Sequence, residues 1–133
     1  MTQSTNRGET DLAVLLRTMS PEAQPGDWFF GTIDPATSVR AAATVRESEG
    51  LSVLVDRDEA ERLGIDTTHV YRWITLRVHS SLDAVGLTAA VSAQLTDHGI
   101  SCNVIAGAHH DHLLVPASRL NDALAALRQL SER

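Results

Sequence analysis

The sequence contains no lysine, and this absence excludes two common classes of enzyme. All 11 basic residues are arginine, against 17 acidic residues, which gives a formal net charge of -6. A Schiff-base enzyme and a Walker-type phosphate loop both need a lysine amine. The negative charge also argues against nucleic acid or anionic lipid as a partner, because both are bound by surplus positive charge.

Cysteine and long apolar runs are also scarce. Cys102 is the single cysteine, so the chain cannot form an internal disulfide. No apolar run approaches the roughly 20 residues of a membrane-spanning helix. Residues 1–10 are polar and lack the hydrophobic region of an export signal, so we expect a frayed N-terminus and a cytoplasmic protein. What remains is 43% hydrophobic residues in 133 positions, enough for one compact unit or two very small ones.

The first half of the chain contains patterns for helices at its two ends and strands between them. Leucines at helical spacing between Asp11 and Met19 predict a short helix, which the stretch SPEAQPG ends. Extended segments are predicted for WFFGTID, RAAATVRES and EGLSVLV. Asp56 and Gly64 are suited to cap the two ends of a helix in DRDEAERLG.

The second half begins with the strand VYRWITLRVH, in which aliphatic side chains on one face alternate with aromatic and polar side chains on the other. Ser80 and Asp83 stand at capping-box spacing and predict the start of a helix that Gly99 ends. Two short strands, ISCNVIAG and HLLVP, and a last helix opened by Ser118 follow. Strand, helix, strand, strand, helix is most of a ferredoxin-like unit.

We therefore predict an α+β fold of two ferredoxin-like subdomains, with antiparallel sheets and helices packed on one face. The first subdomain covers residues 11–68 and the second residues 69–133. The first half has no opening strand of its own, so we expect the subdomains to share or exchange strands. Exposed edges of such sheets can pair with a second copy, and we expect a homodimer.

Several features of the segment from Val78 to Leu127 are those of one known family. An apolar strand runs into DAVGL at residues 83–87, a helix ends at HGI, and a strand containing Asn103 and a helix of DALAAL type follow. In these features the segment resembles an ACT domain, a ferredoxin-like regulatory module that commonly binds amino acids. From about Asp11 the whole chain is similar to an uncharacterised bacterial family of small tandem ACT-domain proteins. The resemblance implies a regulatory protein that binds a small molecule, and we expect neither an enzyme nor a cofactor.

The turn around Gly86 is a candidate ligand site. A glycine in the first turn of a helix lets another group, a ligand or a neighbouring helix, approach the backbone closely. The helix dipole and the free amides of residues 81–85 suit a carboxylate, and an amine would need an acceptor. Capping and helix packing are the purely structural alternative. The resemblance implies a cleft between subdomains or subunits, and the ligand-binding residues that we predict are Ser81, Asp83, Ala84, Val85, Gly86, Leu87, Asn103 and Ile105.

The segment GAHHDHLLV gathers three of the six histidines of the chain. On a strand, His110 and His112 would share one face. A metal ion there would need a further donor, for which His79 and Cys102 are the candidates. The spacings HExxH and CxxC are absent from the sequence, so we favour a hairpin or the wall of a ligand pocket and keep a metal site as an alternative.

No group of residues predicts an enzyme. Serine, histidine and aspartate occur together at residues 79–83, but a catalytic triad is normally gathered from distant segments. Glu47 and Glu49 offer paired carboxylates, which we interpret as a solvated strand end. Large aromatic residues are expected in the core or in subunit contacts, namely Trp28, Phe29 and Trp73. The sequence thus favours a protein that binds a small molecule, with a protein-interaction module and a metal-binding protein as alternatives.

Overall fold

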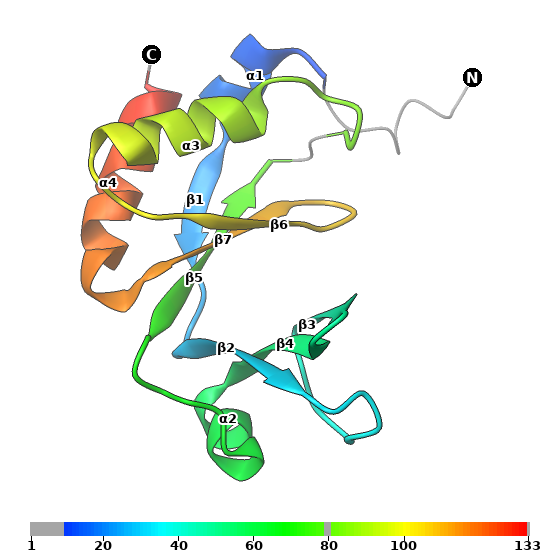
Figure 1. Ribbon diagram of the computed structural model, residues 1–133. Helices are drawn as coiled ribbons and strands as arrows, with labels where there is room; N and C mark the ends of the chain where they lie inside the picture. The colour runs from blue at the N-terminus through cyan, green and yellow to red at the C-terminus, as the bar shows by residue number, and fades with distance from the viewer. Residues whose placement is uncertain (1–9, 79–80, 133) are drawn as a thin grey trace.

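One antiparallel seven-stranded sheet extends through the computed structural model, which describes residues 10–78 and 81–132 (Figure 1). The helices are α1 (Leu12–Thr18), α2 (Arg57–Leu63), α3 (Leu87–Asp97) and α4 (Leu120–Ser131). The strands are β1 (Ser20–Ala23), β2 (Trp28–Ile33), β3 (Ala43–Glu47), β4 (Gly50–Asp56), β5 (Tyr71–Arg77), β6 (Asn103–Ala106) and β7 (Asp111–Pro116). A short 3-10 turn, Ala117–Arg119, precedes α4.

The sheet divides into two lobes. Its strands follow the order β3-β4-β2-β5-β7-β6, and β1 pairs with β5 off this path. We call β2, β3, β4 and α2 the first lobe, and the remaining elements the second lobe. Figure 1 shows the first lobe below the second, whose helices gather on one side of its strands. The predicted α+β class with antiparallel strands is confirmed.

The second lobe has the predicted ferredoxin-like order, with β5, α3, β6, β7 and α4 following one another. Its core joins the predicted stripe of α3, which includes Val91 and Leu95, to apolar residues of the sheet such as Ile74 and Leu113. All four of these side chains are buried. Burial of apolar side chains between helices and one sheet face is the main stabilising term in such a layer.

Elements from both sides of the expected boundary at residues 68 and 69 pack together. Leu15 of α1 and Met19 lie in the core of the second lobe, although both come from the first half of the chain. The strand β1 pairs with β5 from Ser20↔Arg77 to Ala23↔Ile74. The second lobe therefore takes elements from both halves, and in the described residues the first lobe keeps one helix, α2.

The strand β1 was not predicted, because the prolines of SPEAQPG favoured a break. Pro21 lies in the middle of β1, opposite Leu76, and is buried. A proline lacks the N–H that a central strand would need, but it is tolerated where one edge of the strand makes no ladder. Since β1 pairs with β5, its other edge can accommodate the proline.

Local signals predicted α2 correctly. The Asp56 side chain accepts a hydrogen bond from the Glu59 N–H at 2.9 Å, as an N-cap does. Gly64 ends the helix with φ of 71°, the left-handed conformation that a glycine adopts without steric cost.

One backbone pair and two pairs of aromatic side chains join the two lobes. Among the residues that the structure describes, the backbone pair Trp28↔Tyr71 connects β2 to β5. Around it, the rings of Trp28 and Trp73 lie 4.9 Å apart and those of Phe30 and Tyr71 5.2 Å apart, both edge to face. Trp28 and Trp73 thus form the lobe junction, whereas Phe29 is fully buried in the core of the first lobe.

Some predictions concern residues outside the described ranges. The expected frayed N-terminus, residues 1–10, lies outside them except for Thr10, and so do His79 and Ser80. Within the described ranges, no helix has both the length and the apolar character needed to cross a membrane.

Glu59 is a buried carboxylate that fastens α2 to the loop before β3. It accepts hydrogen bonds from the Arg62 guanidinium at 2.7 and 2.8 Å and from the Arg40 backbone N–H at 2.7 Å. Its side chain is 1% exposed. The hydrogen bond from Arg62, followed by that from the Arg40 N–H, lowers the pKa of Glu59 to about 2. Buried carboxylates with this number of donors stay charged.

We predict that Glu59→Gln lowers the melting temperature by several degrees at neutral pH, because Arg62 loses its charged partner. A carboxylate with a lowered pKa stabilises the fold above its ordinary value of 4.5 and loses that effect as the pH falls toward about 2. The difference in melting temperature should therefore shrink across this pH window. The exposed neighbour Glu61 provides the control, and an equal effect of Glu61→Gln would contradict the assignment.

Candidate ligand site

The turn before α3 differs from the predicted capping box. Gly86 has φ of 108°, which no helical residue has, so α3 begins at Leu87 instead of near Ser80. The hydroxyl of Ser81 accepts a hydrogen bond from the Asp83 N–H at 3.1 Å, and the Ser81 carbonyl accepts from the Ala84 N–H at 3.0 Å. Residues 81–86 therefore form a separate turn, and the prediction that Asp83 lies in the first turn of the helix was wrong.

Gly86 faces a neighbouring helix, one of the two alternatives that the sequence left open. A Cβ at this position would lie 3.0 Å from Cδ2 of Leu12 in α1. The positive φ and this close contact together explain the glycine. The backbone at Gly86 is thus covered by α1.

The hairpin between β6 and β7 forms the opposite wall of the site. Its turn is closed by the Gly107 N–H, which donates to the His110 carbonyl at 2.9 Å. The strand β7 begins at Asp111, whose alternation with Leu113 and Val115 places all three on the helix-facing side of the sheet. Asp111 consequently points toward α3.

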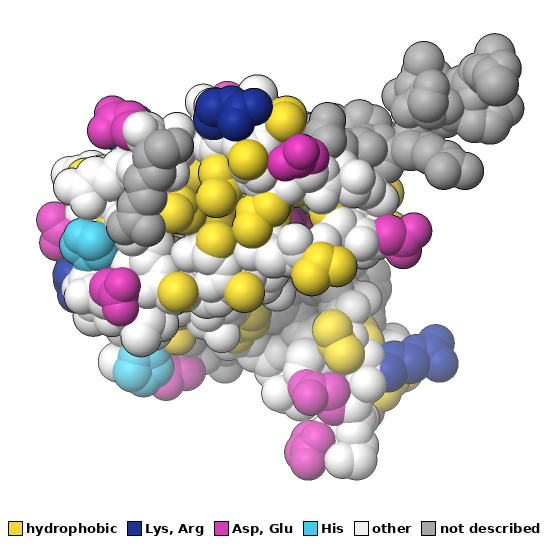
Figure 2. Space-filling view, turned by 90° about the horizontal axis from the view of Figure 1, so that it is seen from above, with side chains coloured by type: hydrophobic (Ala, Val, Ile, Leu, Met, Phe, Trp, Pro, Cys, Tyr) yellow, Lys and Arg dark blue, Asp and Glu magenta, His cyan; other side chains and the backbone are white. Residues whose placement is uncertain are grey.

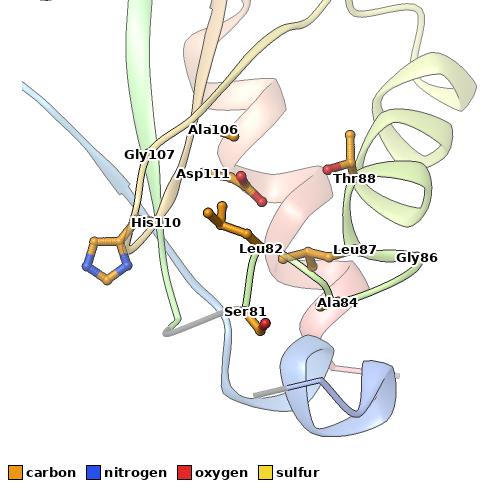
Figure 3. Close-up of a pocket in the computed structure, with 10 residues that line it drawn as sticks. All are labelled: Ser81, Leu82, Ala84, Gly86, Leu87, Thr88, Ala106, Gly107, His110 and Asp111. Carbon is orange, nitrogen blue, oxygen red and sulfur yellow. The ribbon is translucent and has the colours of Figure 1, made fainter. Parts of the chain in front are cut away.

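A cavity of about 170 Å³ lies between this turn and this hairpin. In Figure 3, the Asp111 carboxylate and the Thr88 hydroxyl point toward each other, and the His110 ring lies on the other side of the hairpin from Asp111. All lining residues belong to the second half of the chain, so this cavity is not a cleft between the lobes. They are Ser81, Leu82, Ala84, Gly86, Leu87, Thr88, Ala106, Gly107, His110 and Asp111.

The cavity offers opposite charges to a ligand on its two walls. The positive end of α3 lies on one wall, and its N-cap, Gly86, has no side chain with which to cap the first amides. On the other wall, partial burial raises the pKa of the Asp111 carboxyl, although His112 and His110 nearby act in the opposite direction. The arrangement can therefore hold an anionic group at α3 and a cationic group at Asp111.

The structure brings half of the predicted site residues together. Ser81, Ala84, Gly86 and Leu87 line the cavity. The side chains of Asp83 and Val85 are exposed in the same turn. The sequence analysis did not name Asp111 as a ligand-binding residue, although it gave the wall of a ligand pocket as one interpretation of the segment that contains it.

The two predicted residues of β6 lie on the wrong face of the sheet for this cavity. Asn103 pairs with Leu114 and Ile105 pairs with His112, and paired residues share a face. That face is opposite to the one that carries Asp111. Ile105 instead lines a separate apolar groove of about 130 Å³, together with Phe30 and residues of β3 and β4.

The other candidates have structural partners. The described residues contain no group of three or more histidine, cysteine, aspartate or glutamate side chains that could hold a metal ion. Burial raises the pKa of the Cys102 thiol to about 11, so this residue packs as a neutral group against the second-lobe core. Glu47 is exposed and accepts a hydrogen bond from the Ser52 hydroxyl.

Comparison with known proteins identifies the family. Models of the ACT domain match residues 7–72 and residues 68–129. The chain belongs to the ACT-domain family. It carries two ACT domains in tandem, as the resemblance implied, and no curated protein matches it.

Solved structures agree with this assignment. A Vibrio cholerae protein of unknown function, described as a possible transport protein, is 43% identical to this tandem ACT protein with a TM-score of 0.81, over 90% of this chain and 95% of that one. An Agrobacterium tumefaciens protein has 18% identity and a TM-score of 0.63 over 85% and 89% of the two chains. The Clostridium acetobutylicum aspartate kinase has 7% identity and a TM-score of 0.60, over 86% of this chain and 34% of its own. The last two show the ferredoxin-like fold alone.

We predict that Gly86→Ala destabilises the tandem ACT protein by roughly 1 to 3 kcal/mol, the cost of an unfavourable backbone conformation. Gly99→Ala is the control, since φ there is also positive, at 68°, but nothing lies within 4 Å of its Cβ position. Urea unfolding should give the larger loss for Gly86→Ala. In the double variant with Leu12→Ala, the part of the stability loss that comes from the close contact should be recovered. If the free-energy changes of the two single variants simply add, the contact is contradicted.

Proposed function

We propose that this tandem ACT protein is a cytoplasmic regulatory protein that binds a small amino acid in the cavity between α3 and the β6–β7 hairpin. The family itself consists of regulatory ligand-binding modules rather than catalytic ones. The observation that carries the proposal is the pairing of the α3 N-terminus with the Asp111 carboxylate across one small cavity. A free α-amino acid carries one carboxylate and one ammonium group, which match these two walls.

The size and lining of the cavity favour a short side chain. Its volume of about 170 Å³ is small for a ligand pocket and suits a compact amino acid. Leu82, Leu87 and Ala106 offer apolar contacts, and the hydroxyl of Thr88 offers one hydrogen bond. We infer that small aliphatic or hydroxyl-bearing amino acids fit better than aromatic or charged ones.

Protonation of Asp111 should oppose binding. Because partial burial raises the pKa of this carboxyl, Asp111 takes up a proton at a higher pH than an exposed aspartate does. The ammonium group of the ligand favours the charged carboxylate. Affinity should therefore fall as the pH decreases into the range in which Asp111 titrates.

We predict that Asp111→Asn weakens binding about ten- to hundredfold, the loss expected for a hydrogen bond between charged groups. A thermal-shift screen of the twenty amino acids would find the ligand, since a ligand at 100 times its dissociation constant adds about 2.7 kcal/mol. Calorimetry would then compare the wild type with Asp111→Asn at neutral pH.

Asp83→Asn is the matched control, because Asp83 belongs to the turn of residues 81–86 that borders the cavity, but its side chain is exposed. N-acetylation of the ligand removes the ammonium charge and should abolish binding to the wild type while changing little in Asp111→Asn. If no amino acid stabilises the protein, the proposed function is wrong.

A second copy of the chain is the partner that we infer. Leu82 and Val85 are 73% and 84% exposed beside the cavity, which is unusual for large apolar side chains. Figure 2 shows hydrophobic side chains gathered on the end of the molecule where Figure 1 places α1 and α3. The same exposed residues would also support the alternative, an interaction module that assembles with a different protein without a ligand.

We predict that Val85→Asp shifts the protein from dimer to monomer, because a charge would be buried in the interface. Light scattering after size-exclusion chromatography gives the mass directly. Ala36→Asp, at an exposed position in the loop between β2 and β3, is the control. A monomeric wild type at high concentration would support the interaction-module alternative.

A further inference from the structure

The ring of His112 is held in one protonation state by its neighbours on β5. The indole N–H of Trp73 donates to Nδ1 of His112 at 3.1 Å. The hydroxyl of Thr75 also lies 3.1 Å from Nδ1, and it accepts a hydrogen bond from the Gln24 side-chain amide at 3.1 Å. Nδ1 must therefore act as an acceptor, which a neutral imidazole protonated at Nε2 can do.

Protonation of His112 would break this arrangement at Trp73 in particular. An imidazolium donates from both nitrogens, and an indole N–H can only donate. The Thr75 hydroxyl can rotate and accept instead, but Trp73 cannot change its role. The Trp73 indole would then face a like donor, lose its acceptor and have to turn away.

Trp73 is also the residue that the second lobe contributes to the lobe junction. Its ring packs edge to face on Trp28 of β2 at 4.9 Å and on His112 at 5.4 Å. Backbone pairing between β2 and β5 is confined, in the residues that the structure describes, to Trp28↔Tyr71. The orientation of one indole ring thus bears on the contact between the lobes.

We propose that His112 is a proton-sensitive latch, which holds the two lobes together through Trp73 and Trp28 when neutral and releases them when protonated. The latch lies on the face of β7 opposite to the cavity, and it does not depend on the proposed ligand. It links the packing of the tandem domains to the pH of the surroundings.

The charges around His112 come from three elements. Arg77 on β5 and His110 before β7 oppose its protonation, whereas Asp111 favours it. Glu22 on β1 accepts a hydrogen bond from Arg77 at 3.2 Å, which offsets part of the positive charge of Arg77. Burial is the largest cause that lowers the pKa of His112 from its ordinary 6.5.

This direction fixes the sign of the pH effect. In the unfolded chain His112 takes up a proton near pH 6.5, but in the folded chain it does so only at lower pH. Neutral His112 therefore contributes its full stability above pH 6.5, its ordinary pKa. The contribution is lost as the pH falls from 6.5 toward the lower pKa of the folded chain.

The test uses the two tryptophans of the chain, which give two indole N–H signals in a ¹H–¹⁵N spectrum. Titration of the full-length protein from about pH 8 to about pH 4 should shift the Trp73 indole signal with a midpoint below the ordinary histidine value. As the pH falls through the midpoint, the protection factor against hydrogen exchange at that indole, and at the Tyr71 and Trp28 amides, should decrease roughly fivefold, the factor for one lost hydrogen bond. The protection factor is compared because the intrinsic exchange rate itself changes with pH.

His112→Gln should remove the titration, because a neutral amide oxygen can accept from Trp73 at every pH. His98→Gln on the far side of α3 should leave it unchanged, since the ring of His98 interacts with the Gln94 carbonyl of its own helix. If His112→Gln does not fold, Trp73→Phe removes the N–H and should make the Trp28 signal insensitive to pH. A wild-type titration that persists in His112→Gln or Trp73→Phe, or a folded wild type with no titration, would overturn the latch.

Discussion

Alternation of side chains along β5 is the constraint on which the whole structure depends. One face of this strand buries Ile74 and Leu76 against the helices of the second lobe. The other face presents Trp73 and Thr75 to His112, and Trp73 to the first lobe. Because β5 also pairs with β1, β2 and β7, it positions both lobes at once. A shift of one residue in its register would exchange the two faces and lose both sets of contacts.

The elements that could be predicted from the sequence are those whose ends are determined locally. In α2, Asp56 and Gly64 bond to the backbone of their own helix, so the boundaries follow from the seven residues of the helix and the one cap at each end. The start of α3 could not be found in this way, because Gly86 has a positive φ and packs beside Leu12 of α1, which is far away in the sequence. The strand β1 was missed for a similar reason, since its partner β5 lies some 50 residues further along the chain.

The candidate site shows the same division between local and distant information. A turn near Gly86 could be located from sequence alone, and four of its predicted residues line the cavity. The amides of Asp83 and Ala84, which were expected to be free, donate hydrogen bonds to Ser81. The acceptor for an ammonium group, Asp111, could not be found from the sequence, because only the pairing of β6 with β7 determines which face of the sheet carries it. Asn103, which the family resemblance indicated, is opposite Leu114 and lies on the other face. Face assignment thus requires the register, which a single sequence does not contain.

Two neighbouring residues of β7 connect the cavity with the lobe junction. Asp111 and His112 are consecutive residues, and alternation directs them to opposite faces of the sheet. Gly107, which lines the cavity, also lies beside the His112 ring, because a Cβ added there would come within 3.1 Å of its Nε2. The negative charge of Asp111 favours protonation of His112. A ligand ammonium group that neutralised this charge would favour neutral His112 and so the closed junction. Filling of the cavity and packing of the lobes would then stabilise each other by the same amount, as linkage requires.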